Sequence, residues 1–162
     1  MGLQIGDIVP RKSIGFEDLS GKVVAVDAFN AIYQFLSSIR QQDGTPLMDN
    51  EKRVTSHLSG LFYRNIALLA EGIKLVYVFD GEYHDLKNKT KEKRAEVKIE
   101  AADKYEAAKS GDDVESMGRY ARQMSKITGE MIEESKGLLE AMGIAVVQAP
   151  GEGEMQCAQL VK

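Results

Sequence analysis

The sequence is poor in residues and segments that mark several classes of protein. It has a single cysteine, Cys157, which excludes an internal disulfide and suits a reducing compartment. Two histidines, far apart, and one thiol make a zinc site unexpected. No apolar run approaches the roughly 18 residues of a membrane helix, and the first ten residues lack the pattern of a secretory signal. We therefore expect an intracellular protein without membrane association.

Basic residues do not predominate either. The 162 residues include 21 Lys and Arg against 25 Asp and Glu, which gives a formal net charge of −4. This balance argues against a surface coated with positive charge for nucleic acid. Residues 85–98 differ, because six basic side chains outnumber three acids there. Any anion site is therefore expected to be local.

Short apolar runs alternate with helical patterns along the chain. Segments 22–27, 75–79 and 144–147 are continuous and rich in β-branched residues, as buried parallel strands are. Helical spacing follows over 31–40, with Asn30 as a plausible N-cap, and again over 129–142. The sequence thus predicts an α/β fold with a mostly parallel central sheet flanked by helices. Only three strands appear and the last helix has no terminator, so we expect an incomplete part of a longer protein.

A further helix is predicted between the first two strands. Thr55 or Ser56 can cap it, and Gly72 follows its end. The expected buried face consists of Leu58, Leu61, Phe62, Ile66 and Leu69.

Acidic residues follow the predicted strands where each strand ends. Asp27 and Asp80 end two of them, and the third leads into Glu152 and Glu154. Ligands of open parallel sheets bind beyond the carboxyl ends of the strands, so we expect these acids at one edge. Such a cluster stays ionised near neutral pH only with cations, and ligands restricted to oxygen favour Mg²⁺ or Mn²⁺. Two such ions can support displacement at a phosphoryl group.

Each acid also has a structural explanation. An aspartate at a strand end commonly caps a helix or a turn. The glutamates after Pro150 can simply complement a helix dipole. The coincidence of three such endings at one sheet edge favours the metal site.

A long charged helix is predicted over residues 85–109, without a continuous apolar stripe, so it should not pack fully into a core. One face carries Lys87, Lys91, Arg94 and Lys98. Following Asp80 so closely, this face can contact a scissile phosphate. The alternative is a solvated helix with ion pairs between successive turns.

An aromatic residue and an arginine share one side of the first predicted helix. Tyr33 and Arg40 can stack on a base and contact a phosphate, respectively. A partly exposed tyrosine without such a role is the alternative.

Five stretches resemble the flap endonuclease family, in particular its archaeal members: "MGLQIG", "VDAFNAIYQFL", "TSHLSGLFYRN", "VYVFDGE" and "MGIAVVQAPGEGE". The similarity extends from Met1 to Lys162. It implies a PIN-like 5′-nuclease core, truncated in this chain, with a helical arch inserted over residues 82–128. It also implies cleavage of 5′ flaps in branched DNA during replication and repair, with 5′–3′ exonuclease activity and two Mg²⁺ ions, for which Mn²⁺ can substitute.

The resemblance also assigns roles to individual residues. It implies metal coordination by Asp27, Asp80, Glu152 and Glu154, and catalytic contacts from Lys87 and Arg94 at the base of the arch. It implies DNA contacts for Gly2, Tyr33, Arg40, Arg64, Lys91, Lys98 and Glu152. The implied partners are DNA with a 5′ flap and a sliding clamp (PCNA), which the family binds through a C-terminal segment absent here.

The chain also departs from the family. Tyr83 and His84 replace two common prolines, and Lys98 replaces an arginine that archaeal members tend to have. Further aspartates that complete the family's metal sites do not occur by residue 162. The alternatives for this chain are therefore a non-catalytic nucleic-acid-binding piece or a PIN-like ribonuclease. If the source is archaeal, the compartment is the cytoplasm or nucleoid.

Overall fold

The computed structural model describes residues 9–10, 12–81, 88–111 and 113–161, with the backbone alone over 88–98 and at 123. Three parallel strands form its sheet, in the order β1 (Val23–Asp27), β2 (Lys74–Phe79) and β3 (Ala145–Gln148). In their register Asp27 lies opposite Val78, and Phe79 opposite Gln148. The carboxyl ends of all three strands therefore meet at one edge, which confirms the predicted parallel α/β fold.

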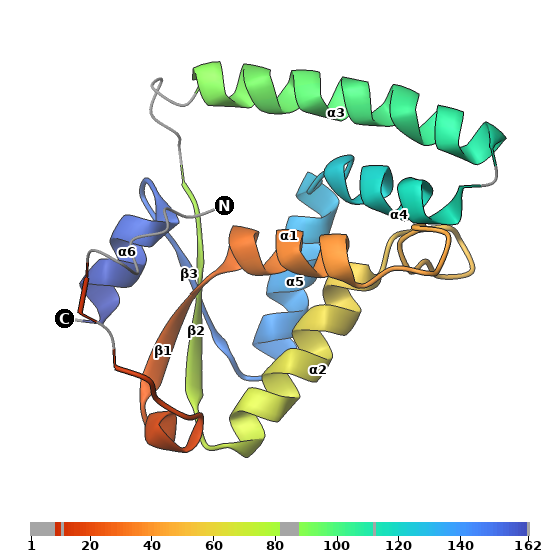
Figure 1. Ribbon diagram of the computed structural model, residues 1–162. Coiled ribbons are helices and arrows are strands. Elements are labelled where there is room, and N and C mark those ends of the chain that lie inside the picture. The colour runs from red at the N-terminus through yellow and green to blue at the C-terminus, as the bar shows by residue number, and fades with distance from the viewer. Residues whose placement is uncertain (1–8, 11, 82–87, 112, 162) are drawn as a thin grey trace.

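Helices cover both faces of the sheet (Figure 1). On one side lie α1 (Ala28–Ser38), α2 (Ser56–Ala70) and α5 (Gly129–Ala141). On the other side α6 (Gly153–Leu160) contacts β1 and β2. A single 3-10 turn, η1 (Glu17–Leu19), precedes β1. This layering surrounds the central strand with apolar side chains.

The core centres on alternate residues of β2. Leu75, Tyr77 and Phe79 are buried with Ile32 of α1 and Leu139 of α5. By contrast, β1 and β3 lie at the two edges of the described sheet and are at most half-buried. The expectation that these two strands are buried was therefore wrong.

The cap of α1 differs from the prediction. Asn30 was expected to cap it, but the helix begins at Ala28 and Asp27 is the N-cap. Asp27 Oδ1 accepts the backbone N–H of Asn30 at 3.0 Å. Because β1 runs directly into α1, the residue that ends the strand also caps the helix.

The buried face of α2 was also predicted wrongly in part. Leu61 is buried, but Phe62, Ile66 and Leu69 are exposed by 41%, 45% and 38%. The buried residues of α2 are Ser56, His57, Gly60, Leu61 and Asn65.

Close packing and a buried hydrogen bond explain this orientation of α2. A Cβ on Gly60 would lie 2.2 Å from Cγ of Phe35 in α1, so the missing side chain lets the two helices approach. In addition, Tyr77 Oη donates to Asn65 Oδ1 at 2.8 Å. Small and polar residues therefore face the core, and periodicity of apolar residues alone gives the wrong face.

Two further helices lie outside this core. α3 (Asn88–Ser110) packs on α4 (Val114–Gln123), which contacts α1. Asp113 caps α4, since its Oδ1 accepts the N–H of Ser116 at 3.0 Å. In Figure 1, α3 lies at the end of the molecule where the strands have their carboxyl ends. Within the described part of the chain, no helix is long and apolar enough to cross a membrane.

Candidate functional site at the acidic sheet edge

Asp80 directly follows β2 and joins it to the start of α6. Its Oδ1 accepts the backbone N–H of Gly153 at 2.6 Å. Its carbonyl oxygen accepts a hydrogen bond from Gln148 Nε2, also at 2.6 Å. Next to it, the N–H of Gly81 donates to the carbonyl of Gly151 at 2.7 Å. These bonds fasten the segment that carries Glu152 and Glu154 to the end of β2.

This fastening needs glycine at two positions. A Cβ on Gly153 would lie 2.5 Å from Asp80 Oδ1, and a Cβ on Gly81 would lie 2.2 Å from the carbonyl oxygen of Ala149. A side chain at either position would push the two segments apart. Neither glycine had been singled out in the sequence, although Gly153 alternates with glutamates in "GEGE" and Gly81 directly follows Asp80.

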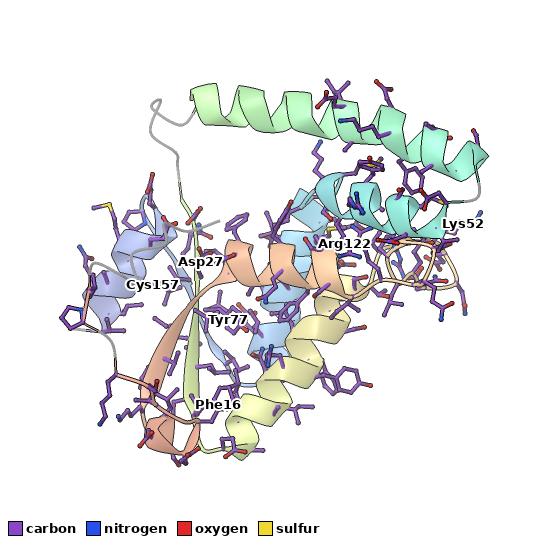
Figure 2. All side chains as sticks on the ribbon, viewed as in Figure 1. Phe16, Asp27, Lys52, Tyr77, Arg122 and Cys157 are labelled. Atoms are coloured by element: carbon purple, nitrogen blue, oxygen red, sulfur yellow. The ribbon has the colours of Figure 1, made fainter. Side chains whose placement is uncertain are left out.

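The thiol of Cys157 lies within the electrostatic influence of acids from three segments. Burial raises the pKa of Cys157, and the negative charges of Asp27, Asp80 and Glu154 raise it further. Figure 2 shows Cys157 on α6 and Asp27 at the start of α1. Nothing in the sequence had singled out Cys157 as a neighbour of these carboxylates.

The two glutamates differ in position and burial. Glu152 is the N-cap residue of α6 and is half-buried. Glu154 lies in the first turn of that helix and is exposed. Both therefore lie near the positive end of the α6 dipole, as the structural interpretation requires.

Capping uses one carboxylate oxygen of Asp27 and of Asp80 and leaves the other oxygen of each available to a ligand. Asp27 and Asp80 each use Oδ1 to accept a backbone N–H at a helix start. Over residues 12–81 and the other described segments, Oδ2 of neither aspartate has a hydrogen bond. The capping and metal-binding interpretations are therefore compatible. The same described residues contain no group of three His, Cys, Asp or Glu side chains close enough to hold an ion.

The predicted DNA-contacting residues are spread more widely. Tyr33 is 41% exposed on α1, and Arg64 is exposed on α2. Lys91, Arg94 and Lys98 lie on α3, where the backbone alone is described. Gly2 and Lys87 lie outside the described residues.

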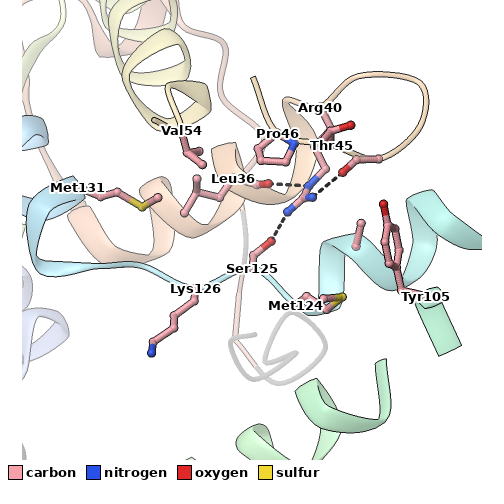
Figure 3. Close-up of a pocket in the computed structure, with 12 residues that line it drawn as sticks. Leu36, Arg40, Thr45, Pro46, Val54, Tyr105, Met124, Ser125, Lys126 and Met131 are labelled. Carbon is pink, nitrogen blue, oxygen red and sulfur yellow. Dashed lines mark hydrogen bonds between the residues drawn. The ribbon is translucent and has the colours of Figure 1, made fainter. Parts of the chain in front are cut away.

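Arg40 follows α1 and is half-buried at the far end of that helix (Figure 3). Its Nε donates to the carbonyl of Leu36 at 2.8 Å, Nη1 to the carbonyl of Gly44 at 2.6 Å, and Nη2 to Ser125 Oγ at 2.6 Å. It borders a largely apolar cavity of about 300 Å³ whose lining includes Tyr105. Burial and the charge of Arg122 lower the pKa of Arg40.

The three parallel strands, with acids beyond their carboxyl ends, define an α/β domain with an acidic sheet edge. The XPG N-terminal domain family matches residues 4–101, which is more than half of the sequence. The chain therefore belongs to this family.

Individual relatives agree with the family assignment. Over 160 residues the chain is 55% identical to flap endonuclease 1 of Pyrococcus furiosus, covering 99% of this chain and 47% of that protein. Over 162 residues it is 49% identical to flap endonuclease 1 of Methanothermobacter thermautotrophicus, covering 100% of this chain and 49% of that protein. The chain thus spans about half the length of these relatives.

Solved structures show the same similarity. Flap endonuclease-1 from Methanococcus jannaschii superposes with a TM-score of 0.69 at 46% identity, covering 99% of this chain and 51% of that chain. The catalytic core of Rad2 in complex with DNA substrate gives a TM-score of 0.57 at 33% identity, covering 91% of this chain and 36% of that chain. The resemblance to flap endonucleases seen in the sequence is thereby confirmed.

Proposed function

We propose that the chain is the N-terminal part of a structure-specific 5′ flap endonuclease with 5′–3′ exonuclease activity on branched DNA. One observation carries the proposal. The hydrogen bond between Asp80 and the N–H of Gly153 fastens the acidic start of α6 to the end of β2. The similarity to flap endonucleases over nearly the whole chain supports the choice of substrate.

In this proposal Asp27, Asp80, Glu152 and Glu154 hold divalent cations, Mg²⁺ or Mn²⁺. The donor set fits such ions, because carboxylate oxygens are the ligands that hard cations prefer. Bound cations supply Lewis-acid stabilisation of the negative charge that develops during phosphodiester hydrolysis. The protein's part is to hold the carboxylates in place through the caps of α1 and α6.

The DNA-contacting roles are also part of the proposal. Residues 82–128 form the helical arch through which a single-stranded 5′ end passes, and Lys87 and Arg94 stabilise charge on the scissile phosphate. Tyr33 stacks on a base near this site. The remaining contacts to DNA come from Gly2, Arg40, Arg64, Lys91, Lys98 and Glu152. A sliding clamp binds the complete protein through a segment outside this sequence. The proposed place of action is DNA replication and repair inside the cell.

A cleavage assay tests the proposal directly. A complete protein carrying this N-terminal half should cut a 5′-flapped duplex in Mg²⁺, and an unbranched duplex much more slowly. Asp80→Ala should abolish cutting while flap binding persists. Undiminished cleavage by Asp80→Ala would refute the metal role of this residue.

For the isolated chain, a second function has support. Among the described residues the acids border one edge without forming a group of three within metal-binding distance. This favours a nucleic-acid-binding piece whose catalytic site is completed elsewhere. Magnesium-dependent cleavage of flapped DNA by the isolated chain would exclude this alternative.

A further inference from the structure

The guanidinium of Arg40 has no acidic partner among the described residues, since nearby Asp43 accepts the N–H of Thr45 instead. The three donor groups of Arg40 bind neutral oxygens of Leu36, Gly44 and Ser125. Within the described segments, no carboxylate lies at ion-pair distance from its guanidinium. A half-buried positive charge is therefore held by dipoles alone, which leaves its charge uncompensated.

Arg122 brings a second positive charge to the same place from α4. Its Nε donates to the carbonyl of Gly118 at 3.1 Å, and the rest of the exposed side chain has no carboxylate partner in the described part of the protein. The charge of Arg122 lowers the pKa of Arg40, so the two guanidinium groups repel each other. In Figure 2, Arg122 lies toward the C-terminal end of α1, away from Asp27.

A polar cavity of about 400 Å³ lies between these two arginines. Apart from them, it is lined by Ser37, Ser38, Gln41, Gln42, Gly44 and Gly118. The side-chain amides of Gln41 and Gln42 can donate further hydrogen bonds to an anion. The hydroxyls of Ser37 and Ser38 already donate to the carbonyls of Tyr33 and Gln34, each at 2.7 Å. By contrast, Arg119 on the same helix pairs with Glu115, so not every arginine of α4 lacks a partner.

We propose that Arg40 and Arg122 together bind one phosphate group in this cavity. Arg122 bonds described residues only through Nε, so its two terminal nitrogens can meet phosphate oxygens as a fork. Each terminal nitrogen of Arg40 keeps one further N–H, and a dianion between the two side chains removes their mutual repulsion. The identification of this phosphate as part of a DNA backbone rests on the proposed function. The 13 residues from Asp27 to Arg40 span roughly 20 Å at helical rise. This distance equals the rise of about six base pairs of duplex, so the site would hold DNA away from the point of cleavage.

The first test uses inorganic phosphate and the chain itself. In ¹⁵N NMR spectra, the side-chain Nε–Hε signals of Arg40 and Arg122 should shift saturably with phosphate, while that of Arg119 should not. Arg122→Ala should remove the response of Arg40. Arg119→Ala is the matched control, because Arg119 lies on the same helix but pairs with Glu115. This variant should keep the response of Arg40 to phosphate.

Charge reversal separates loss of the site from loss of the fold. Arg122→Glu would give Arg40 the carboxylate that it lacks, so the variant should melt at the same or a higher temperature and show no phosphate response. An Arg40 signal that ignores phosphate in the parent chain would overturn the proposal. An equal loss of response in Arg119→Ala and Arg122→Ala would also overturn it.

The second test distinguishes free phosphate from a DNA backbone. Arg122→Ala should weaken duplex binding several-fold at all sequences and reduce the slope of log affinity against log salt by about one. Arg119→Ala should change the slope less. If Arg40 responds to phosphate but both variants bind duplex equally, the DNA assignment is wrong and the site takes a small anion.

Cleavage provides an independent readout. Loss of flap cleavage in Asp80→Ala, together with no phosphate response at Arg40, would uphold the proposed function and reject this site. A saturable phosphate response at Arg40, without any metal-dependent cleavage by the complete protein, would uphold this site and reject the proposed function.

Discussion

The two ends of α1 carry opposite charges, and at both ends the charged side chains are held by hydrogen bonds to backbone groups at helix termini. At its start, the carboxylates of Asp27 and Asp80 accept backbone N–H groups at the beginnings of α1 and α6. Beyond its end, Arg40 donates to the carbonyl of Leu36, in the last turn of the helix. Both arrangements agree with the helix dipole, which favours anions at the start and cations at the end.

The difference lies in what each end leaves uncompensated. The acidic end has carboxylates that follow three strands, and under the proposed function these bind cations. At the basic end, Arg40 and Arg122, 82 positions apart in the chain, line one cavity. We propose that this cavity binds an anion. Helix caps thus fix charged groups in position without neutralising them, and the remaining charge is available to a ligand.

The largest effect is expected at the acidic end. Asp80→Asn keeps an oxygen that can accept the N–H of Gly153 but loses the charge. Because even outer partners of metal ligands cost 10–100-fold when removed, Mn²⁺ affinity should fall by at least ~100-fold in calorimetric titrations. Asp113→Asn, which alters the cap of α4 instead, is the control and should bind Mn²⁺ like the parent. Equal affinities in parent and Asp80→Asn would show that Asp80 only caps.

A somewhat smaller effect is expected from the glycine against Asp80. In Gly153→Ala, the new methyl group would collide with Asp80 Oδ1 and displace the carboxylate. We expect Mn²⁺ affinity to fall by ~10-fold or more, as for changes that misorient a ligand. Gly151→Ala is matched, because a Cβ there meets nothing within 4 Å. If both alanine variants titrate alike, the close approach at Gly153 does not position the site.

Substitutions in the core that both ends of α1 share should change the stability of the fold but not the ligand affinity of either end. Gly60→Ala places a methyl group against the Phe35 ring and should lower the free energy of unfolding by ~1–3 kcal/mol. Gly137→Ala, in open space on α5, should raise it by up to ~1 kcal/mol. Urea unfolding measures both values. Affinities for Mn²⁺ and phosphate should stay unchanged in each folded variant, and a selective loss at one end would break the comparison.

The smallest effect concerns pH. His57 of α2 is fully buried, and its Nε2 lies 3.1 Å from Glu134 Oε2 on α5. Burial lowers the pKa of His57 and outweighs Glu134, whose charge and hydrogen bond raise it. The unfolded chain therefore binds the proton more readily, so stability should fall as pH drops below the ordinary histidine pKa of about 6.5.

Urea unfolding between pH 8 and 5 tests this dependence. His57→Gln should flatten the profile below pH 6.5, because the glutamine does not titrate. If the parent instead becomes more stable toward pH 5.5, Glu134 dominates and His57 is held in its charged form.

Much of this arrangement was predictable from the sequence. Short β-branched runs ending in Asp27 and Asp80 indicate parallel strands whose ends meet, and the structure confirms the sheet. Gly72 and Gly143 follow helices at positive φ, as helix terminators commonly do. These features depend on neighbours in the chain, and a sequence shows such neighbours directly.

The rest depends on contacts between distant residues. The buried face of α2 follows from Gly60 against Phe35 and from the hydrogen bond of Asn65 to Tyr77. The close approach of Gly153 to Asp80 joins residues 73 positions apart. Arg122 carried no signal in the sequence, because its significance comes from the cavity it shares with Arg40, which has no ion pair among the described residues. Hydrophobic periodicity and local capping rules contain none of this information.

Paramagnetic broadening by Mn²⁺ tests the central claim most directly. The account predicts that substoichiometric Mn²⁺ broadens the amide signals of Asn30, Gly81 and Gly153 first, and that of Ser125 beside Arg40 much less. Broadening that begins away from the carboxyl ends of β1 and β2, or none at millimolar Mn²⁺, would contradict a shared cation site at this edge.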